Sequence, residues 1–178
     1  MELKDVIVQR RTVRKYCGKE VLKEDLEALV EAANLAPSWK NSQTGRYYII
    51  HSKEMIDKYR NDCFGEYNAG NTKGVGALIV TTFVEKRAGF ERDGTPSNEL
   101  GNGWGCYDLG LQNQNLLLKA HDLGLSTLVM GIRDEPKTRS LLDIPSQELI
   151  VSVIAVGYAL ETPDKPNRKA VSDIVKFY

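Results

Sequence analysis

The chain has 178 residues, the length of one globular domain, and its composition is ordinary, with 42% hydrophobic and 27% charged residues. Basic and acidic residues balance at 24 each, so no overall field attracts nucleic acid or anionic lipid. The start is charged from Glu2 onwards and no apolar run approaches the ~18 residues of a membrane span, so we expect a cytoplasmic protein with one domain over residues 1–178.

Hydrophobic periodicity predicts the elements of the first part of the chain. An amphipathic helix is predicted over residues 23–34, because its apolar residues share one face, and Pro37 ends it. That apolar stripe consists of Leu22, Leu26, Leu29, Val30 and Ala33. The other elements expected here are a short helix over 2–10, a strand over 47–50, a helix over 54–62, a glycine-rich loop over 65–76 and a buried strand over 77–84.

The second part of the chain begins with charged, glycine-containing residues 85–103, which indicate an exposed excursion that we expect to form a lid over the site. The nearly all-apolar run 149–156 predicts a central strand, and 174–178 predicts a short strand at a sheet edge. The fold class is therefore α+β, with a central mixed or antiparallel sheet flanked by helices. The other elements expected are a helix over 104–123, a strand over 126–130 and a helix over 135–142.

Several kinds of chemistry are disfavoured by what the sequence lacks. Three widely spaced cysteines without a Cys-x-x-Cys pair suggest neither a disulfide framework nor a zinc site, so no metal is expected. The two histidines, His51 and His121, have no nucleophile signature near them, which disfavours a hydrolase triad. The glycine-rich segments match neither the Gly-x-Gly-x-x-Gly nor the P-loop pattern, so no Rossmann domain or NTPase is indicated.

Three polar segments stand out instead. Residues 10–16 gather four cations and a threonine hydroxyl, a set that suits a phosphate, although the same run also fits a solvated basic end of the first helix. Residues 36–43 form a loop dense in hydrogen-bonding side chains, directly after an amphipathic helix. Residues 157–169 are polar and cationic and extend towards the C-terminus.

These three segments, in this order and at these positions, resemble the nitroreductase family of FMN-dependent oxidoreductases, and the resemblance runs from about Leu3 to the C-terminus. It implies an intertwined homodimer with two flavin sites at the interface, in which the C-terminal tail crosses to the partner. It also implies tightly but non-covalently bound FMN, with NAD(P)H as co-substrate. The expected reaction is ping-pong, with a nitroaromatic, quinone or similar electron-poor small molecule as acceptor.

The resemblance also implies roles for individual residues. Arg10 and Thr12, with Arg11 as a further candidate, correspond to the front of the FMN phosphate site, and Arg168 and Lys169 correspond to its rear. Arg14 stands where the family places a cation that stabilises negative charge on the reduced ring. No catalytic acid or base is expected, because the cofactor performs the chemistry.

Further positions correspond to contacts with the flavin ring. The loop that reaches the flavin of the other subunit includes Pro37, Ser38, Asn41 and Gln43, and Trp39 either walls the ring or anchors the core. The family commonly follows Asn-Ser-Gln with Pro-Trp, whereas this chain has Thr-Gly-Arg at 44–46. Asn68 or Asn71 is expected at the pyrimidine edge. The turn that contains Met130 and Gly131 corresponds to the backbone near N5.

Other functions remain open on the same fold. Flavin-dependent dehalogenases, flavin-destroying enzymes and dehydrogenases of modified peptides share it, and the 85–103 excursion is the segment expected to distinguish them. A non-enzymatic flavin-binding or regulatory module is an alternative of another class.

Overall fold

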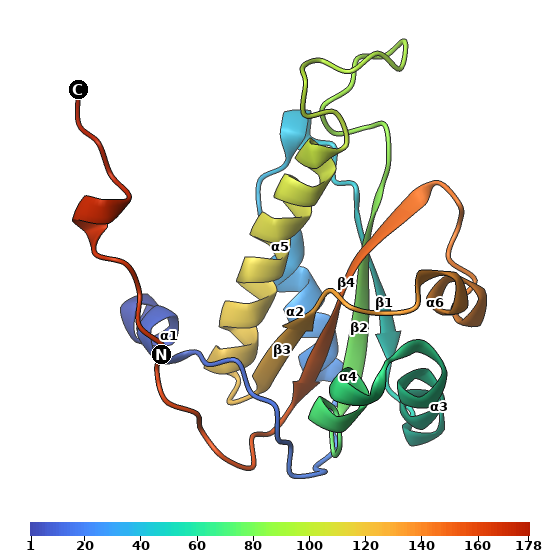
Figure 1. The fold of residues 1–178 in the computed structure, drawn as a ribbon, viewed down its shortest axis with the longest axis vertical. Coiled ribbons are helices and arrows are strands. Elements are labelled where there is room, and N and C mark those ends of the chain that lie inside the picture. Colours follow the sequence, from blue (N-terminus) through green and yellow to red (C-terminus); the bar gives the residue numbers. More distant parts are fainter.

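The computed structural model describes residues 1–178 as a four-stranded sheet with helices on both faces (Figure 1). Neighbouring strands are antiparallel, in the order β1-β2-β4-β3, so the expected α+β class is confirmed and the sheet itself is antiparallel rather than mixed. The long apolar strand is central, as predicted. The strands are β1 (Gly45–Ile50), β2 (Ala77–Val84), β3 (Ser126–Met130) and β4 (Glu148–Gly157).

Helices α2 and α5 cover one face of the sheet, and α3, α4 and α6 cover the other (Figure 1). The bounds predicted for α2 are confirmed, although Leu22 of its expected apolar stripe is 60% exposed. No helix combines the length and apolar character needed to cross a membrane. The helices are α1 (Leu3–Gln9), α2 (Lys23–Asn34), η1 (Trp39–Asn41), α3 (Lys53–Cys63), α4 (Glu66–Asn71), α5 (Gly103–Asp122), α6 (Glu135–Leu141) and η2 (Val171–Asp173).

Two apolar cores follow from the alternation of side chains along the central strands. In β2, Leu78 and Val80 pack towards α3 and α6, whereas Ala77 and Ile79 pack towards α2 and α5. Strand β4 divides its side chains between the same two cores. Because β2 and β4 are covered on both faces, they read in the sequence as continuous apolar runs.

Two sequence expectations were wrong. The predicted loop at 65–76 contains helix α4, which is secured by Arg60, whose guanidinium donates to the Ala69 carbonyl (2.8 Å) and the Thr72 hydroxyl (3.2 Å). These tertiary contacts outweigh the low helix propensity of a segment containing Gly70. Residues 174–178 form no strand, because no strand of this chain lies beside them to pair with.

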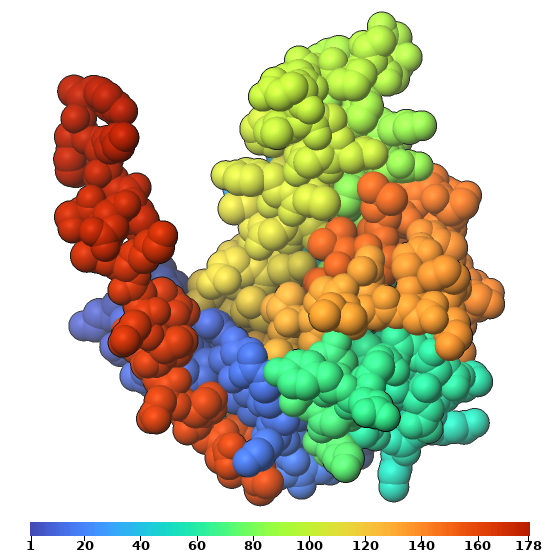
Figure 2. All heavy atoms as spheres, in the orientation of Figure 1, coloured from blue at the N-terminus to red at the C-terminus, as the bar shows by residue number.

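After β4 the chain continues as a C-terminal arm, residues 161–178, that stands clear of the body over its last part (Figure 2). No residue of this arm is buried. It nevertheless carries large apolar side chains that are well exposed, namely Val171, Ile174, Val175, Phe177 and Tyr178.

Candidate functional site

The first and third polar segments meet at one cleft. It has a volume of about 500 Å³ and lies between the residues that follow α1 and the start of the C-terminal arm. The fold therefore brings Arg168 to the same cavity as Arg10, which the sequence expectation required. Lys169 is exposed and does not line the cleft. The basic and hydroxyl residues that line it are Arg10, Arg11, Thr12, Arg14, Lys165 and Arg168.

Local pairing explains how the basic residues reach this cleft. Helix α1 ends at Gln9, and the chain then runs beside β3, where the Val13 amide donates to the Thr127 carbonyl at 3.0 Å. Val13 and Tyr16 point into the core, and the Tyr16 hydroxyl donates to the Val13 carbonyl at 3.0 Å. With these two residues as anchors, Arg14 is left exposed on the cleft side without a hydrogen bond to the protein.

The residues that line the cleft carry more positive than negative charge. Burial lowers the pKa of the Arg10 guanidinium, and the charges of Arg11 and then Arg168 lower it further. Arg11 donates to the Val8 and Arg10 carbonyls at 2.7 and 3.0 Å, but its buried Nε has no partner. The one acidic residue that lines the cleft is Asp164. An anion bound here would relieve the repulsion and satisfy the unused donors.

A second part of the site follows β3 along the free edge of the sheet. Met130 is buried, Gly131 is exposed, and they are flanked by two exposed apolar side chains, Val129 (47%) and Ile132 (79%). From Thr127, beside Thr12, to Gly131 the strand advances by about 13 Å. The basic cleft and the apolar end of β3 thus lie about one strand length apart, a spacing that suits a ligand with an anionic group at one end and a flat ring at the other.

The turn after β3 is held rigidly. The Arg133 guanidinium donates to the Gly131 carbonyl at 2.9 Å and to the Ile150 carbonyl, and the Asp134 amide donates to the Cys63 carbonyl at 2.8 Å. Such contacts fix the backbone at Gly131 between β4 and α3, so an N–H group in this turn keeps a constant direction.

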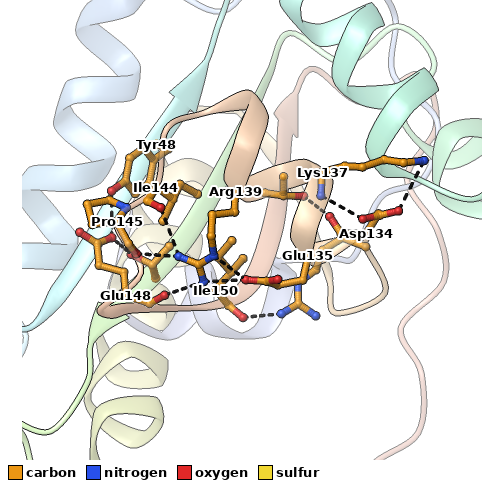
Figure 3. A network of polar contacts seen from close by, with 12 residues as sticks. Tyr48, Asp134, Glu135, Lys137, Arg139, Ile144, Pro145, Glu148 and Ile150 are labelled. Atoms are coloured by element: carbon orange, nitrogen blue, oxygen red, sulfur yellow. Dashed lines mark hydrogen bonds and ion pairs between the residues drawn. The ribbon is translucent and has the colours of Figure 1, made fainter.

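Helix α6, which follows this turn, is fastened to β4 by the network drawn in Figure 3. Asp134 caps the helix by accepting from the Lys137 amide at 3.0 Å. Arg139 accounts for most of the remaining contacts: it pairs with Glu135 at 2.6 Å and donates to the carbonyls of Pro145 and Glu148 at 2.6 and 2.9 Å. The network supports the β3–α6 turn and does not itself line the cleft.

The two asparagines expected at the ring edge lie in or at the end of α4 and differ in what they contact. Asn68 is buried and donates to the Ile132 carbonyl at 2.7 Å, so its amide nitrogen is engaged in holding the β3–α6 turn. Asn71 has a buried amide nitrogen without a partner. Asn71 therefore has an unused donor, whereas Asn68 contributes through the position of the turn.

The second polar segment lies at the other end of α5. Trp39 packs against Trp104 with ring centroids 4.6 Å apart, and its amide donates to Asp108 at 2.9 Å. Pro37, Asn41 and Gln43 are exposed, whereas Ser38 is half-buried and accepts a hydrogen bond from the Gln43 amide at 3.1 Å. Trp39 thus acts as an anchor between the loop and α5. Thr44, where the chain departs from the family pattern, is buried.

One chain does not bring this loop to the cleft. The loop contacts α5 at Asp108. The Arg10 side of the cleft follows α1, which lies at the other end of α5, where the Met1 amino group pairs with Asp122 at 2.8 Å; there the charges of Arg10 and Arg11 also lower the pKa of His121. His121 is thirteen positions after Asp108 in α5, so the two residues lie about 20 Å apart along the helix axis. A ligand that contacts both groups needs the loop of a second copy.

The 85–103 excursion packs beside this loop. Lys40 pairs with Glu91 at 3.4 Å, and the Trp104 indole donates to the Asn98 side chain at 2.9 Å. Gly89, with φ +80°, passes so close to Trp104 that a Cβ would lie 2.6 Å from its ring. The excursion is therefore anchored to the start of α5, at the opposite end of that helix from the cleft of its own chain. The lid over the site stays a prediction, and this position suits the cleft of a partner.

Sequence reasoning missed two residues around these sites. Asp108 is buried, at 3% exposure, on the apolar face of α5, and burial raises the pKa of its carboxyl group. The available signal was an acidic residue four positions before Gln112 and eight before Leu116, on the face of the helix that is buried. His121 had no comparable signal, because only the fold brings it to Arg10.

Comparison with known proteins adds a family assignment. A sequence profile described as "Nitroreductase family" matches residues 7–158. A protein of Methanothermobacter thermautotrophicus, provisionally named NADH dehydrogenase/NAD(P)H nitroreductase, is 30% identical over 92% of this chain and 80% of its own length. An iodotyrosine deiodinase of Thermotoga neapolitana is 26% identical over 94% and 91%. A solved Exiguobacterium sibiricum structure, described as a provisional nitroreductase in complex with FMN, has the same fold, with TM-score 0.82, 19% identity and coverage of 100% and 98%.

Proposed function

The chain belongs to the nitroreductase family, and on that basis we propose that it is an oxidoreductase that binds FMN non-covalently and transfers reducing equivalents from NAD(P)H to a small electron-poor acceptor. The observation that carries this proposal is the cleft in which Arg10, Arg11 and Arg168 converge from the two ends of the chain. When bound, FMN supplies the hydride transfer that no side chain can perform. The protein's own residues bind, orient and polarise it.

The residues present fit the phosphate of such a cofactor. The cations Arg10, Arg11 and Arg168 repel one another, and the unpartnered Nε of Arg11 is a buried donor without an acceptor. A phosphate supplies both the missing charge and the missing acceptors. Each charge-assisted hydrogen bond contributes about 1.5 to 3 kcal/mol, so two or three retain the cofactor without a covalent link.

Arg14 is assigned an electrostatic role. It is exposed on the cleft side and has no acidic partner in the chain, so its charge is available to the ligand. Reduction of the ring leaves negative charge on it, and a fixed cation lowers the energy of that state. The rigid turn at Gly131 contributes a backbone N–H, and Val129 and Ile132 contribute the apolar surface beside it.

The proposed active form is a homodimer. The loop 37–43 lies about 20 Å along α5 from the cleft of its own chain, so its polar side chains complete the site of the partner. The exposed apolar residues of the C-terminal arm give a second reason, since they gain burial only against another copy. Each flavin site is then built from both subunits.

A second candidate is a reductive dehalogenase that uses the same cofactor site. The similarity to an iodotyrosine deiodinase over 94% of this chain favours it as the alternative. Both chemistries need the same cleft, so we expect the 85–103 excursion, which would shape the acceptor pocket, to distinguish them. Turnover of a nitroaromatic or quinone, compared with halide release from a halogenated phenol, separates the two.

The visible absorption spectrum of the purified protein tests the proposal. We expect a flavin spectrum that bleaches after anaerobic addition of NADH or NADPH and returns when a nitroaromatic or quinone is added. Bound flavin that neither nucleotide bleaches would favour a binding module. A protein that does not bind added FMN at all would refute the assignment of the cleft.

A further inference from the structure

Asp108 is a buried acidic residue without a cation to balance it. It lies on the sheet-facing side of α5, is 3% exposed, and makes no ion pair in the chain. Its Oδ2 accepts a hydrogen bond from the backbone amide of Trp39 at 2.9 Å. Burying a carboxylate is costly unless it is well paired, and the hydrogen bond from the Trp39 amide is the contact that compensates part of this cost.

The loop that Asp108 contacts has a strained backbone. Lys40, Asn41 and Gln43 have φ values of 46°, 54° and 47°, in the left-handed region that residues with a Cβ rarely adopt, and the loop contains no glycine to relieve this. Such a conformation persists only where surrounding contacts fix it. The loop therefore needs an attachment to a rigid element.

The contacts that hold the loop differ in how rigid a partner they reach. The pair Lys40–Glu91 is exposed, and the bond from the Gln43 amide to Ser38 lies within the loop itself. The two that reach the rigid helix both involve Trp39: its ring packs on Trp104, and its amide bonds Asp108, one helical turn further on. Trp39 is thus attached to one face of α5 by both its side chain and its backbone. These two contacts form the Trp39 clamp.

We propose that Asp108 is a positioning residue for the cofactor site. By accepting from the Trp39 amide it holds the strained turn in the conformation that presents Ser38, Asn41 and Gln43 to the FMN of the partner subunit. The expected effect on FMN binding rests on the proposed function. The attachment of Trp39 to α5 does not depend on it. Asp108 touches neither cofactor nor acceptor, and its effect is transmitted through Trp39.

Two substitutions separate this role from simple core packing. Asp108→Leu has similar size but cannot accept the bond, whereas Asp108→Asn keeps an acceptor oxygen. Gln112→Leu is the matched control, because Gln112 is also buried one turn further along α5 but accepts from the Tyr47 hydroxyl (3.3 Å) instead of the loop. We expect Asp108→Leu to weaken FMN binding about tenfold to a hundredfold, measured by flavin fluorescence titration. Asp108→Asn should recover most of that loss, and Gln112→Leu should retain wild-type affinity.

A spectroscopic readout reports the loop without the cofactor. Trp39 and Trp104, at 4.6 Å and an interplanar angle of 50°, should give an exciton couplet in the circular dichroism of the cofactor-free protein. We expect the couplet to be lost in Asp108→Leu and kept in Asp108→Asn and Gln112→Leu. Equal FMN affinity and an unchanged couplet in Asp108→Leu would overturn the proposal, as would an equal loss in Gln112→Leu.

If Asp108→Leu does not fold, hydrogen exchange of the wild-type protein decides the matter. The Trp39 amide should exchange as slowly as amides inside α5, because its bond is to a buried carboxylate on that helix. Exchange as fast as that of neighbouring loop amides would refute the clamp. A wild-type protein that binds no FMN would refute the proposed function instead, while the couplet and the exchange rate would still test the clamp.

Discussion

Arg10, just after α1, and Arg168, in the C-terminal arm, face the same cleft, and the charge of Arg168 adds to burial and to the charge of Arg11 in lowering the pKa of Arg10. Three cations that repel one another destabilise the unliganded protein, because Asp164 is the one acidic residue that lines the cleft. A bound anion would offset this repulsion.

Replacing Arg10 with glutamate should abolish FMN retention. The change removes at least one charge-assisted hydrogen bond, about 1.5 to 3 kcal/mol, and adds repulsion, so the dissociation constant should rise by about a hundredfold or more. The flavin content of the purified variant and a fluorescence titration measure this. Lys4→Glu is the control, because it makes the same charge change on the exposed side of α1, away from the cleft. A full flavin complement in Arg10→Glu would disprove the phosphate assignment.

Replacing Arg14 with alanine should slow reduction of the bound flavin by NADH or NADPH. Loss of one fixed charge beside the ring should lower the single-turnover rate about tenfold, less than for a fully buried donor because Arg14 is exposed. Stopped-flow absorbance measures the rate. Lys15→Ala is the matched control, since Lys15 pairs with Glu161 at 3.0 Å and does not line the cleft. Unchanged single-turnover kinetics in Arg14→Ala would rule out this role.

Binding of FMN should raise the pKa of His121. Burial lowers this pKa, and the charges of Arg10 and Arg11 lower it further, so an anion that offsets those charges moves it towards the ordinary value of 6.5. The chain has two histidines, so proton NMR titration resolves both, and His121→Gln assigns the signals. His51, which does not line the cleft, is the internal control. A His121 pKa that FMN leaves unchanged would contradict the proposed location of the phosphate.

The same lowered pKa sets the direction of a pH effect on stability. Because the unfolded chain binds the proton more tightly than the folded chain, the cofactor-free protein loses stability as the pH falls through 6.5 and recovers it as the pH rises. His121→Gln should flatten this part of the stability profile, measured by urea unfolding. A wild-type profile that falls with rising pH in this range would contradict the shift.

Much of the fold was predictable because the elements in the core carry clear periodicity. Strands β2 and β3 and helix α2 have the bounds expected from the sequence, since the strands are short apolar, β-branched runs and the apolar residues of α2 repeat with the helical period of 3.6. Helix α4 was missed because its stability comes from Arg60, a residue of another helix. The helix propensity of residues 66–71 does not reflect such a tertiary contact.

The candidate site was predictable only in part, for the same reason. The basic cluster at 10–14 and Arg168 were expected from the family resemblance, and the fold places them around one cleft. Asp108 accepts from the Trp39 amide, and the charge of Arg10 acts on His121, although these partners are far apart in the sequence. The sequence also did not predict the distance between the loop and the cleft. That distance depends on the length of α5 and on the end of α5 against which each segment packs.

The C-terminal arm should determine the oligomeric state. Ile174 and Phe177 are 68% and 94% exposed in the single chain, and burial of a large apolar side chain contributes about 2 kcal/mol. Replacing both with serine removes about 4 kcal/mol from each arm, and both arms of the dimer are changed, so the dimer should weaken by at least about a thousandfold, measured by sedimentation equilibrium. Since each proposed flavin site includes the partner's 37–43 loop, FMN affinity should fall in parallel. The body should keep its unfolding midpoint at low protein concentration, because the arm contributes no buried residue.

Lys176→Ser, a polar change in the same arm, should alter neither the dimer affinity nor the FMN affinity. A double variant that still sediments as a dimer with full FMN affinity would show that the arm does not hold the two copies together.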